Sequence, residues 1–156
     1  MRRAAQEIKD QVVLEEILKG QVICRLGIMD GDKPYVVPVD YGYEDGCLFI
    51  HTAIEGKKLD CLRLNNHVCF EIDELKKTMT DDVPCKWSSM YQSIIGYGDV
   101  EFVEGGDAKR HGLDVIMRQH GAEGELDYRD AHVNATEILK VRIMEMTGKR
   151  SKVWEE

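Results

Sequence analysis

The sequence predicts an α+β domain in which a small antiparallel barrel of about six strands carries flanking helices. Strand-like segments come in runs joined by short turns, and three segments show the 3.6-residue period of an amphipathic helix. A parallel sheet would need a helix between successive strands, so parallel winding does not fit this order. The 156 residues are the usual size of one domain, and we expect residues 1–156 to form a single domain.

Composition and charge narrow the possible functions. The chain is 43% hydrophobic and 32% charged, as globular proteins are, and 29 acidic against 21 basic residues give a net charge of −8. That balance argues against a nucleic-acid binder and against a polybasic membrane-surface protein. We find neither a signal peptide nor an apolar run of membrane-spanning length, and five cysteines without a CxxC pair fit free thiols. We therefore expect a cytoplasmic protein.

The first third of the chain is predicted to be one helix and three antiparallel strands. The helix covers residues 10–20, with Asp10 as its N-cap and Gly20 closing it in the left-handed conformation. The strands are expected at residues 22–29, 35–43 and 47–51. Pro38 lies inside the second strand and has no N–H to donate, so we expect it at a sheet edge, at a bulge or where the sheet opens.

The rest of the chain alternates between helical and extended patterns. We expect helices at residues 55–66 and 107–119, and strands at residues 67–73, 91–103 and 137–146. Gly96 and Gly98 predict a bend or bulge in the long strand, and Gly112 weakens the second of these helices. Residues 74–84 and 121–134 are expected to be loops.

The turn between a strand and a helix at residues 51–58 gives the clearest signal of a binding site. A helix N-terminus presents unpaired N–H groups and a partial positive charge, and here it coincides with Gly56, Lys57 and Lys58. Together with the Thr52 hydroxyl, these groups can bind a phosphate. The alternative is a solvated lysine pair on an ordinary surface helix.

Several segments, in this order, resemble the flavin-binding superfamily typified by pyridoxamine 5′-phosphate oxidase, and most closely its nitroimidazole-resistance branch. The segments that carry the resemblance are residues 35–39, 48–53, 55–58, 68–71, 86–87, 91–98 and 143–149. The resemblance implies a six-stranded antiparallel split β-barrel with flanking helices, and FMN bound at the interface of a homodimer.

The resemblance also implies which residues bind the cofactor. Thr52, Lys57 and Lys58 would hold the phosphate, with Gly56 letting the backbone approach and Ala53 in the same turn. His51 would lie beside the phosphate or the ribityl chain, and Ser93 near the ring. The isoalloxazine edge would meet the backbone of Val37, Pro38 and Val39. The arginines that pyridoxamine-phosphate oxidases use for their substrate have no match here, which argues against vitamin B6 oxidation.

The leading hypothesis is an FMN-dependent oxidoreductase that reduces small molecules, nitro compounds among them, with NAD(P)H as a transient donor. The flavin would carry the electron chemistry, so no catalytic side chain is assigned. The alternatives are a flavin carrier, a deazaflavin protein, or a haem-binding protein with His51, His111 or His120 as axial ligand. Trp87 either stacks on the flavin or lines the substrate pocket, or it packs in the core or the dimer interface. For Ser93, the alternative is an ordinary strand serine without a role in binding. Histidine and cysteine spacings predict no metal site.

Overall fold

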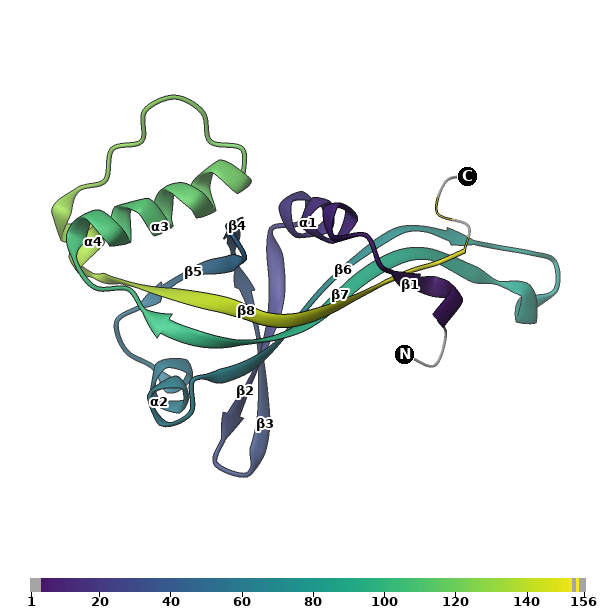
Figure 1. Ribbon diagram of the computed structural model, residues 1–156, viewed down its shortest axis with the longest axis horizontal. Helices are drawn as coiled ribbons and strands as arrows, with labels where there is room; N and C mark the ends of the chain where they lie inside the picture. The colour runs from purple at the N-terminus through teal and green to yellow at the C-terminus, as the bar shows by residue number, and fades with distance from the viewer. Residues whose placement is uncertain (1–3, 153, 155–156) are drawn as a thin grey trace.

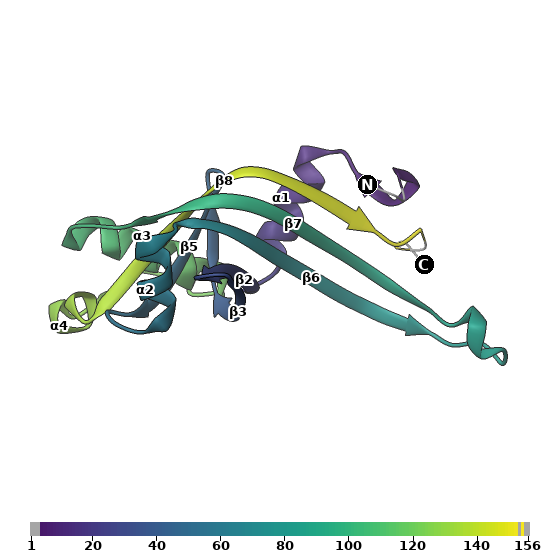
Figure 2. The ribbon, with the colours of Figure 1, turned by 90° about the horizontal axis from the view of Figure 1, so that it is seen from below.

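The computed structural model describes residues 4–152 and Trp154, and its centre is one antiparallel sheet (Figures 1 and 2). The strands run in the order β3–β2–β6–β7–β8–β5–β4, and β1 pairs with β8. Their bounds are β1 Glu7–Ile8, β2 Ile23–Asp30, β3 Lys33–Asp40, β4 Gly42–Glu44, β5 Cys47–Ala53, β6 His67–Met79, β7 Ser88–Phe102 and β8 Thr136–Arg150. The helices are η1 Ala4–Gln6, α1 Gln11–Gly20, α2 Lys57–Leu64, η2 Pro84–Lys86, α3 Gly106–Gln119 and α4 Asp130–Asn134.

The predicted α+β class with an antiparallel sheet is confirmed, but the predicted six-stranded split barrel is not. The sheet has eight strands, and its path ends at β3 on one side and β4 on the other. The two end strands follow each other in the chain, with Tyr41 between them. Tyr41 is fully buried and its hydroxyl donates to the Leu18 carbonyl at 2.7 Å, so this connection is tied to α1 instead of forming a ladder that closes the sheet.

The main hydrophobic core fills the inside of the curled sheet. It contains residues of α1, α2 and six strands, among them Leu14, Leu18, Leu26, Ile50, Leu62, Phe70 and Val141. Asp10 caps α1 as predicted, because its carboxylate accepts from the Val12 amide at 2.9 Å. The prediction that Gly20 closes the helix in the left-handed conformation was wrong. Gly20 has no positive φ, and the helix ends at Gln21, which has an extended backbone.

A second layer lies on the other face of β5 and β8, where α3 packs through Val115 and Ile116 (Figure 1). Gly112 explains how α3 approaches so closely. A Cβ added at this glycine would stand 2.7 Å from the Ile138 side chain and 3.2 Å from Phe49. The short helix α4 lies in the stretch predicted to be a loop, and no helix in the described part of the chain is long and apolar enough to cross a membrane.

The prediction of a loop at residues 74–84 was wrong for most of its length. The strand β6 continues to Met79 and pairs with the start of β7, and the two form a hairpin that projects from the body (Figure 2). Polar residues hid this strand because residues 74–79 are exposed or half-buried on both faces, so no apolar alternation is needed there. Trp87 follows η2 at the tip of this hairpin, is 55% exposed, and donates from its indole N–H to the Asp81 carbonyl at 2.8 Å.

Two predicted strand irregularities are confirmed. The register between β7 and β8 shifts between Tyr97 and Gly98, where the glycine comes so close to β8 that a Cβ would stand 2.4 Å from the Arg142 carbonyl oxygen. Pro38 lies on β3, an end strand of the sheet, and pairs with Arg25 on β2 alone. Its missing N–H therefore does not interrupt a central ladder.

Candidate functional site

The N-terminus of α2 is shaped as an open turn. Gly56 is its N-cap with φ 135° and ψ 165°, a region that residues with a side chain rarely adopt. No atom lies within 4 Å of the place where a Cβ would stand, and the Gly56 carbonyl accepts from the amides of Leu59 and Asp60. The first turn of α2 therefore has its amide end exposed beside Gly56, as an anion site requires.

Lys57 connects this turn to the β2–β3 hairpin. Its ammonium nitrogen lies 2.7 Å from a carboxylate oxygen of Asp30 and 4.9 Å from the centre of the Tyr35 ring. The hydrogen bond from Lys57 lowers the pKa of Asp30, and the same contact raises the pKa of Lys57. Both side chains remain partly exposed, so this ion pair is accessible to a solute.

Lys58 lies deeper than Lys57 and faces the inside of the sheet. Burial lowers the pKa of its ammonium group, and the charge of Lys58 in turn acts on the buried thiol of Cys24. Cys24 is the register partner of Val39 on β3. The two lysines thus bring the start of α2 next to both strands of the β2–β3 hairpin.

Strand alternation separates the predicted residues of β5. Successive side chains of a strand point to opposite faces, and Cys47 and Phe49 pack against α3. His51 and Ala53 share their parity and lie on the α3 face, whereas Thr52 shares the parity of Leu48 and Ile50 in the main core. Of these three residues, Thr52 is the one on the same face as Lys58.

The predicted residues of β3 and β7 are divided in the same way. Val39 is buried and Val37 half-buried against the main core, whereas Pro38 is exposed on the opposite face of the sheet. Ser93 also lies on that opposite face. Arg25 lies between it and Pro38: Arg25 is the register partner of Pro38 and forms an ion pair with Asp73. Asp73 is in turn the register partner of Ser93. Three strand spacings, about 14 Å, separate β3 from β7.

The outward face of β3, β2, β6, β7 and β8, here called the open face, carries an unusual share of apolar residues. Register places Val36, Gly27, Cys69 and Tyr97 in one row, and Pro38, Arg25, Glu71 and Ile95 in the next. Large apolar residues that are at least 40% exposed on this face are Ile23, Met29, Val36, Leu75, Ile95, Tyr97 and Met144. Contiguous apolar exposure of this kind marks an interaction surface.

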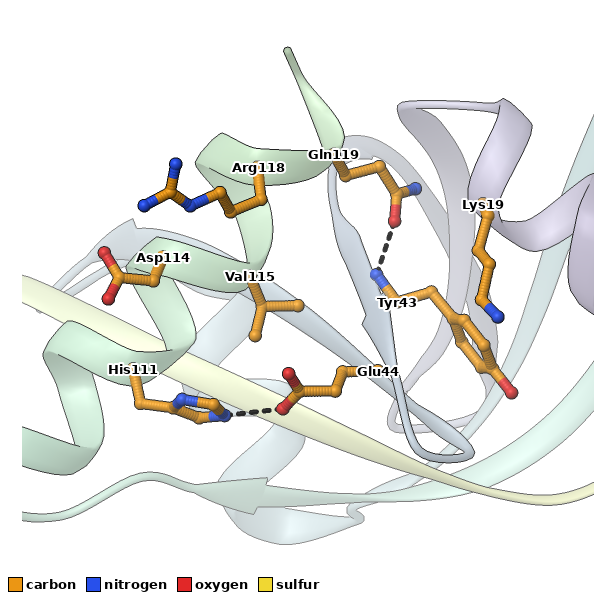
Figure 3. Close-up of a pocket in the computed structure, with 8 residues that line it drawn as sticks. All are labelled: Lys19, Tyr43, Glu44, His111, Asp114, Val115, Arg118 and Gln119. Atoms are coloured by element: carbon orange, nitrogen blue, oxygen red, sulfur yellow. Dashed lines mark hydrogen bonds and ion pairs between the residues drawn. The ribbon is translucent and has the colours of Figure 1, made fainter. Parts of the chain in front are cut away.

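A separate pocket of about 490 Å³ lies between α1, β4 and α3 (Figure 3). Two pairs of its lining groups bond to each other: His111 pairs with Glu44 at 2.6 Å, and Gln119 accepts from the Tyr43 amide at 2.7 Å. Gln119 also donates to the Leu18 carbonyl at 2.9 Å. None of the ten predicted cofactor residues lines it. The pocket thus lies where α1, β4 and α3 meet. His111, one of the three candidate haem ligands, lines it and is bonded to Glu44.

Sequence reasoning missed Asp30 and Tyr35, which contact Lys57 directly. Asp30 lay outside the predicted strands, and Tyr35 was included only in a predicted strand and in a segment that carries the family resemblance. Their contact with Lys57 spans two separate supersecondary units, so neither spacing nor local composition signals it. Arg25, which links Pro38 to Asp73, was missed for the same reason.

The sequence matches the family described as pyridoxamine 5′-phosphate oxidase over residues 10–150. A search of curated protein sequences found no match. Among solved structures, a candidate 5-nitroimidazole antibiotic resistance protein from Bacteroides thetaiotaomicron is 36% identical, with a TM-score of 0.82. The similarity covers 92% of this chain and 85% of that protein.

Two further solved structures share the fold at lower identity. The FAD- and haem-binding protein of Mycobacterium smegmatis is 20% identical with a TM-score of 0.85, and covers 97% of this chain and 76% of its own. The flavocytochrome Anf3 of Azotobacter vinelandii is 17% identical with a TM-score of 0.83, and covers 97% of this chain and 72% of its own. At these identities the similarity concerns the fold alone.

Proposed function

This chain belongs to the pyridoxamine 5′-phosphate oxidase family, and from that membership and the α2 N-terminus we propose that it binds a flavin, FMN, through its phosphate. The observation that supports the proposal is the open helix start formed by Gly56, Lys57 and Lys58. Thr52 precedes it on the face of β5 that points to the main core. The flavin-binding proteins among the structural neighbours support the same cofactor class.

The chemistry of these groups fits a phosphate ester. Helix amides and two ammonium groups are charge-assisted donors, and a hydroxyl on the same face adds a neutral one. The absence of a Cβ at Gly56, with open space around it, allows an oxygen-rich group to approach the backbone. We assign the phosphate to Thr52, Gly56, Lys57 and Lys58, and the ring edge to the exposed edge of β3 along Val37, Pro38 and Val39.

The structure gives less support to His51, Ala53 and Ser93 as cofactor-binding residues. His51 and Ala53 lie on the face of β5 that α3 covers, and Ser93 lies on the open face about three strands from β3. Among residues 4–152, no hydrogen bond or ion pair joins these three side chains to Lys57 or Lys58. We propose that they contribute to a shared cofactor from the second subunit of a dimer.

We further propose that the protein is a homodimer formed through the open face, with the flavin at its border. A two-fold interface buries the same patch on both subunits, so a sheet face rich in exposed apolar residues needs only a second copy to cover it. The charges on this face come in both signs, with Arg25 and Lys149 beside Glu71 and Asp73. That mixture allows a two-fold pairing to be self-complementary.

The reaction proposed for the site is reduction of small molecules, nitro compounds included, with NAD(P)H as electron donor. A bound flavin supplies the transfer of a hydride or of single electrons. The protein's own part is to bind the phosphate, hold the ring against the β3 edge and shield it from water at the subunit border.

The cofactor is tested by its own spectrum. Protein purified from cells is expected to show flavin absorption bands and to release FMN on denaturation, identified by mass spectrometry. Stopped-flow mixing of the flavin-loaded protein with NADH and NADPH then measures whether either reduces it. A Soret band instead of flavin bands would replace this proposal with a haem-binding one.

A pair of double variants tests the phosphate site. Lys57→Ala with Lys58→Ala is expected to weaken FMN binding at least about tenfold, because two charge-assisted contacts are lost. Binding of riboflavin, which has no phosphate, should change little. Lys76→Ala with Lys77→Ala removes the same charge from the projecting hairpin and serves as control. Equal FMN affinity in both double variants would exclude the α2 lysines as the phosphate site.

A further inference from the structure

Asp30 places a carboxylate beside the proposed phosphate site. It ends β2, and its Oδ2 atom lies 2.7 Å from the Lys57 ammonium nitrogen. Its other oxygen accepts from the Cys61 thiol of α2 at 3.8 Å. Asp30 is thus bound by two residues of the helix whose N-terminus would hold the phosphate.

This geometry leaves Lys57 already neutralised by an internal partner. A phosphate that takes a hydrogen bond from Lys57 either displaces Asp30 or shares the ammonium group with it. In both arrangements the phosphate stands within a few ångströms of a carboxylate. Like charges at that distance repel even in water, and each added negative charge on the ligand raises the cost.

The cost depends on the kind of phosphate. A phosphate monoester, as in FMN, carries about −1.5 to −2 charges at pH 7, because its second pKa is about 6. Each phosphate of the diphosphate in FAD carries a single negative charge, and riboflavin has none. A carboxylate at this position therefore acts most strongly against the monoester and not at all against the uncharged flavin.

We propose that Asp30 is a specificity-determining residue that competes with the ligand phosphate for Lys57 and so reduces the preference for FMN over FAD. The inference rests on the phosphate site proposed above. Asp30 itself takes no part in holding the flavin. Its ion pair with Lys57 would instead affect which flavin is bound.

The test measures dissociation constants for FMN, FAD and riboflavin with the apoprotein in low-salt buffer at pH 7.5. Asp30→Asn keeps the shape of the side chain and removes its charge, and FMN is expected to bind about fivefold more tightly. FAD should gain less, and riboflavin should not change. Asp32→Asn in the same turn is the matched control, because it removes the same charge and no ion pair of Asp32 occurs within residues 4–152.

The outcomes separate this inference from the proposed function. An FMN gain that is confined to Asp30→Asn, exceeds the gain for FAD and shrinks at high salt supports it. An equal gain for FMN and FAD would overturn it. Equal FMN affinities for the two variants, or weaker FMN binding by Asp30→Asn, would overturn the competition while leaving flavin binding intact. No binding of any flavin by the wild-type chain would instead contradict the proposed function. Asp30→Ser provides a second charge-removing variant if the asparagine form does not fold.

Discussion

At the residue scale, the candidate site depends on one glycine whose conformation is unusual. Gly56 combines φ 135° with open space around its missing side chain. The space means that an alanine would meet no neighbour, and the φ value means that it would still be strained. Steric crowding and backbone strain can therefore be separated at this position.

We expect Gly56→Ala to lower the free energy of unfolding by about 1–3 kcal/mol, because alanine disfavours this backbone region. Gly20→Ala is the control: Gly20 also has open space around it but has no positive φ, so alanine there should leave stability unchanged or raise it by about 0.4–1 kcal/mol. Urea denaturation measures both. If the two variants have equal stabilities, the turn at Gly56 does not hold the strained conformation.

At the element scale, helix α3 shows how packing overrides helix propensity. Gly112 lowers the propensity of this segment, and the sequence alone read it as a weakness. In the folded protein it is buried between α3 and the sheet, where Ile138 and Phe49 occupy the space that a methyl group would need. The glycine therefore sets the distance at which α3 covers β5 and β8.

Gly112→Ala is expected to destabilise the protein by about 1–3 kcal/mol through overpacking, although alanine is the better helix former by about 1 kcal/mol. The measurement is urea denaturation followed by circular dichroism. Gly112→Ala combined with Ile138→Leu should recover part of the loss, because leucine has no methyl group on its Cβ and so lacks the Cγ2 atom nearest the new side chain. A single variant more stable than wild type would show that α3 moves freely on the sheet.

At the scale of the whole molecule, the open face is the feature that a single chain does not explain. Its apolar residues are spread over strands far apart in sequence and meet only in the folded sheet. The projecting hairpin continues the same face through Leu75, which pairs with Tyr91. Such a surface is expected to be covered in solution.

Ile95→Asp is expected to convert the proposed homodimer to monomer, because it puts a charge in the part of the open face that the dimer would bury. Ile95 is 48% exposed in the single chain, so the monomer itself should still fold. Val12→Asp, at an exposed apolar residue of α1 outside the open face, should remain a dimer. Sedimentation velocity distinguishes the two, and a wild-type monomer would contradict the proposed assembly.

The sequence by itself determined the elements whose pattern is local. Turn residues, alternation and the Asp10 cap predicted the α+β class, the antiparallel run and the helix at Lys57 and Lys58. These features were readable because each depends on neighbours within a few positions. The resemblance in the order of the segments predicted the family to which the chain belongs.

Only the tertiary structure decided which residues share a face. It formed an open sheet of eight strands where a six-stranded split barrel was expected, and it extended β6 through residues that looked like a loop. It also placed His51 and Thr52 on opposite sides of β5. It also brought Asp30 to Lys57 from another hairpin. The physical reason is the same in each case: strand register and long-range packing, set by contacts distant in sequence, fix where a side chain points.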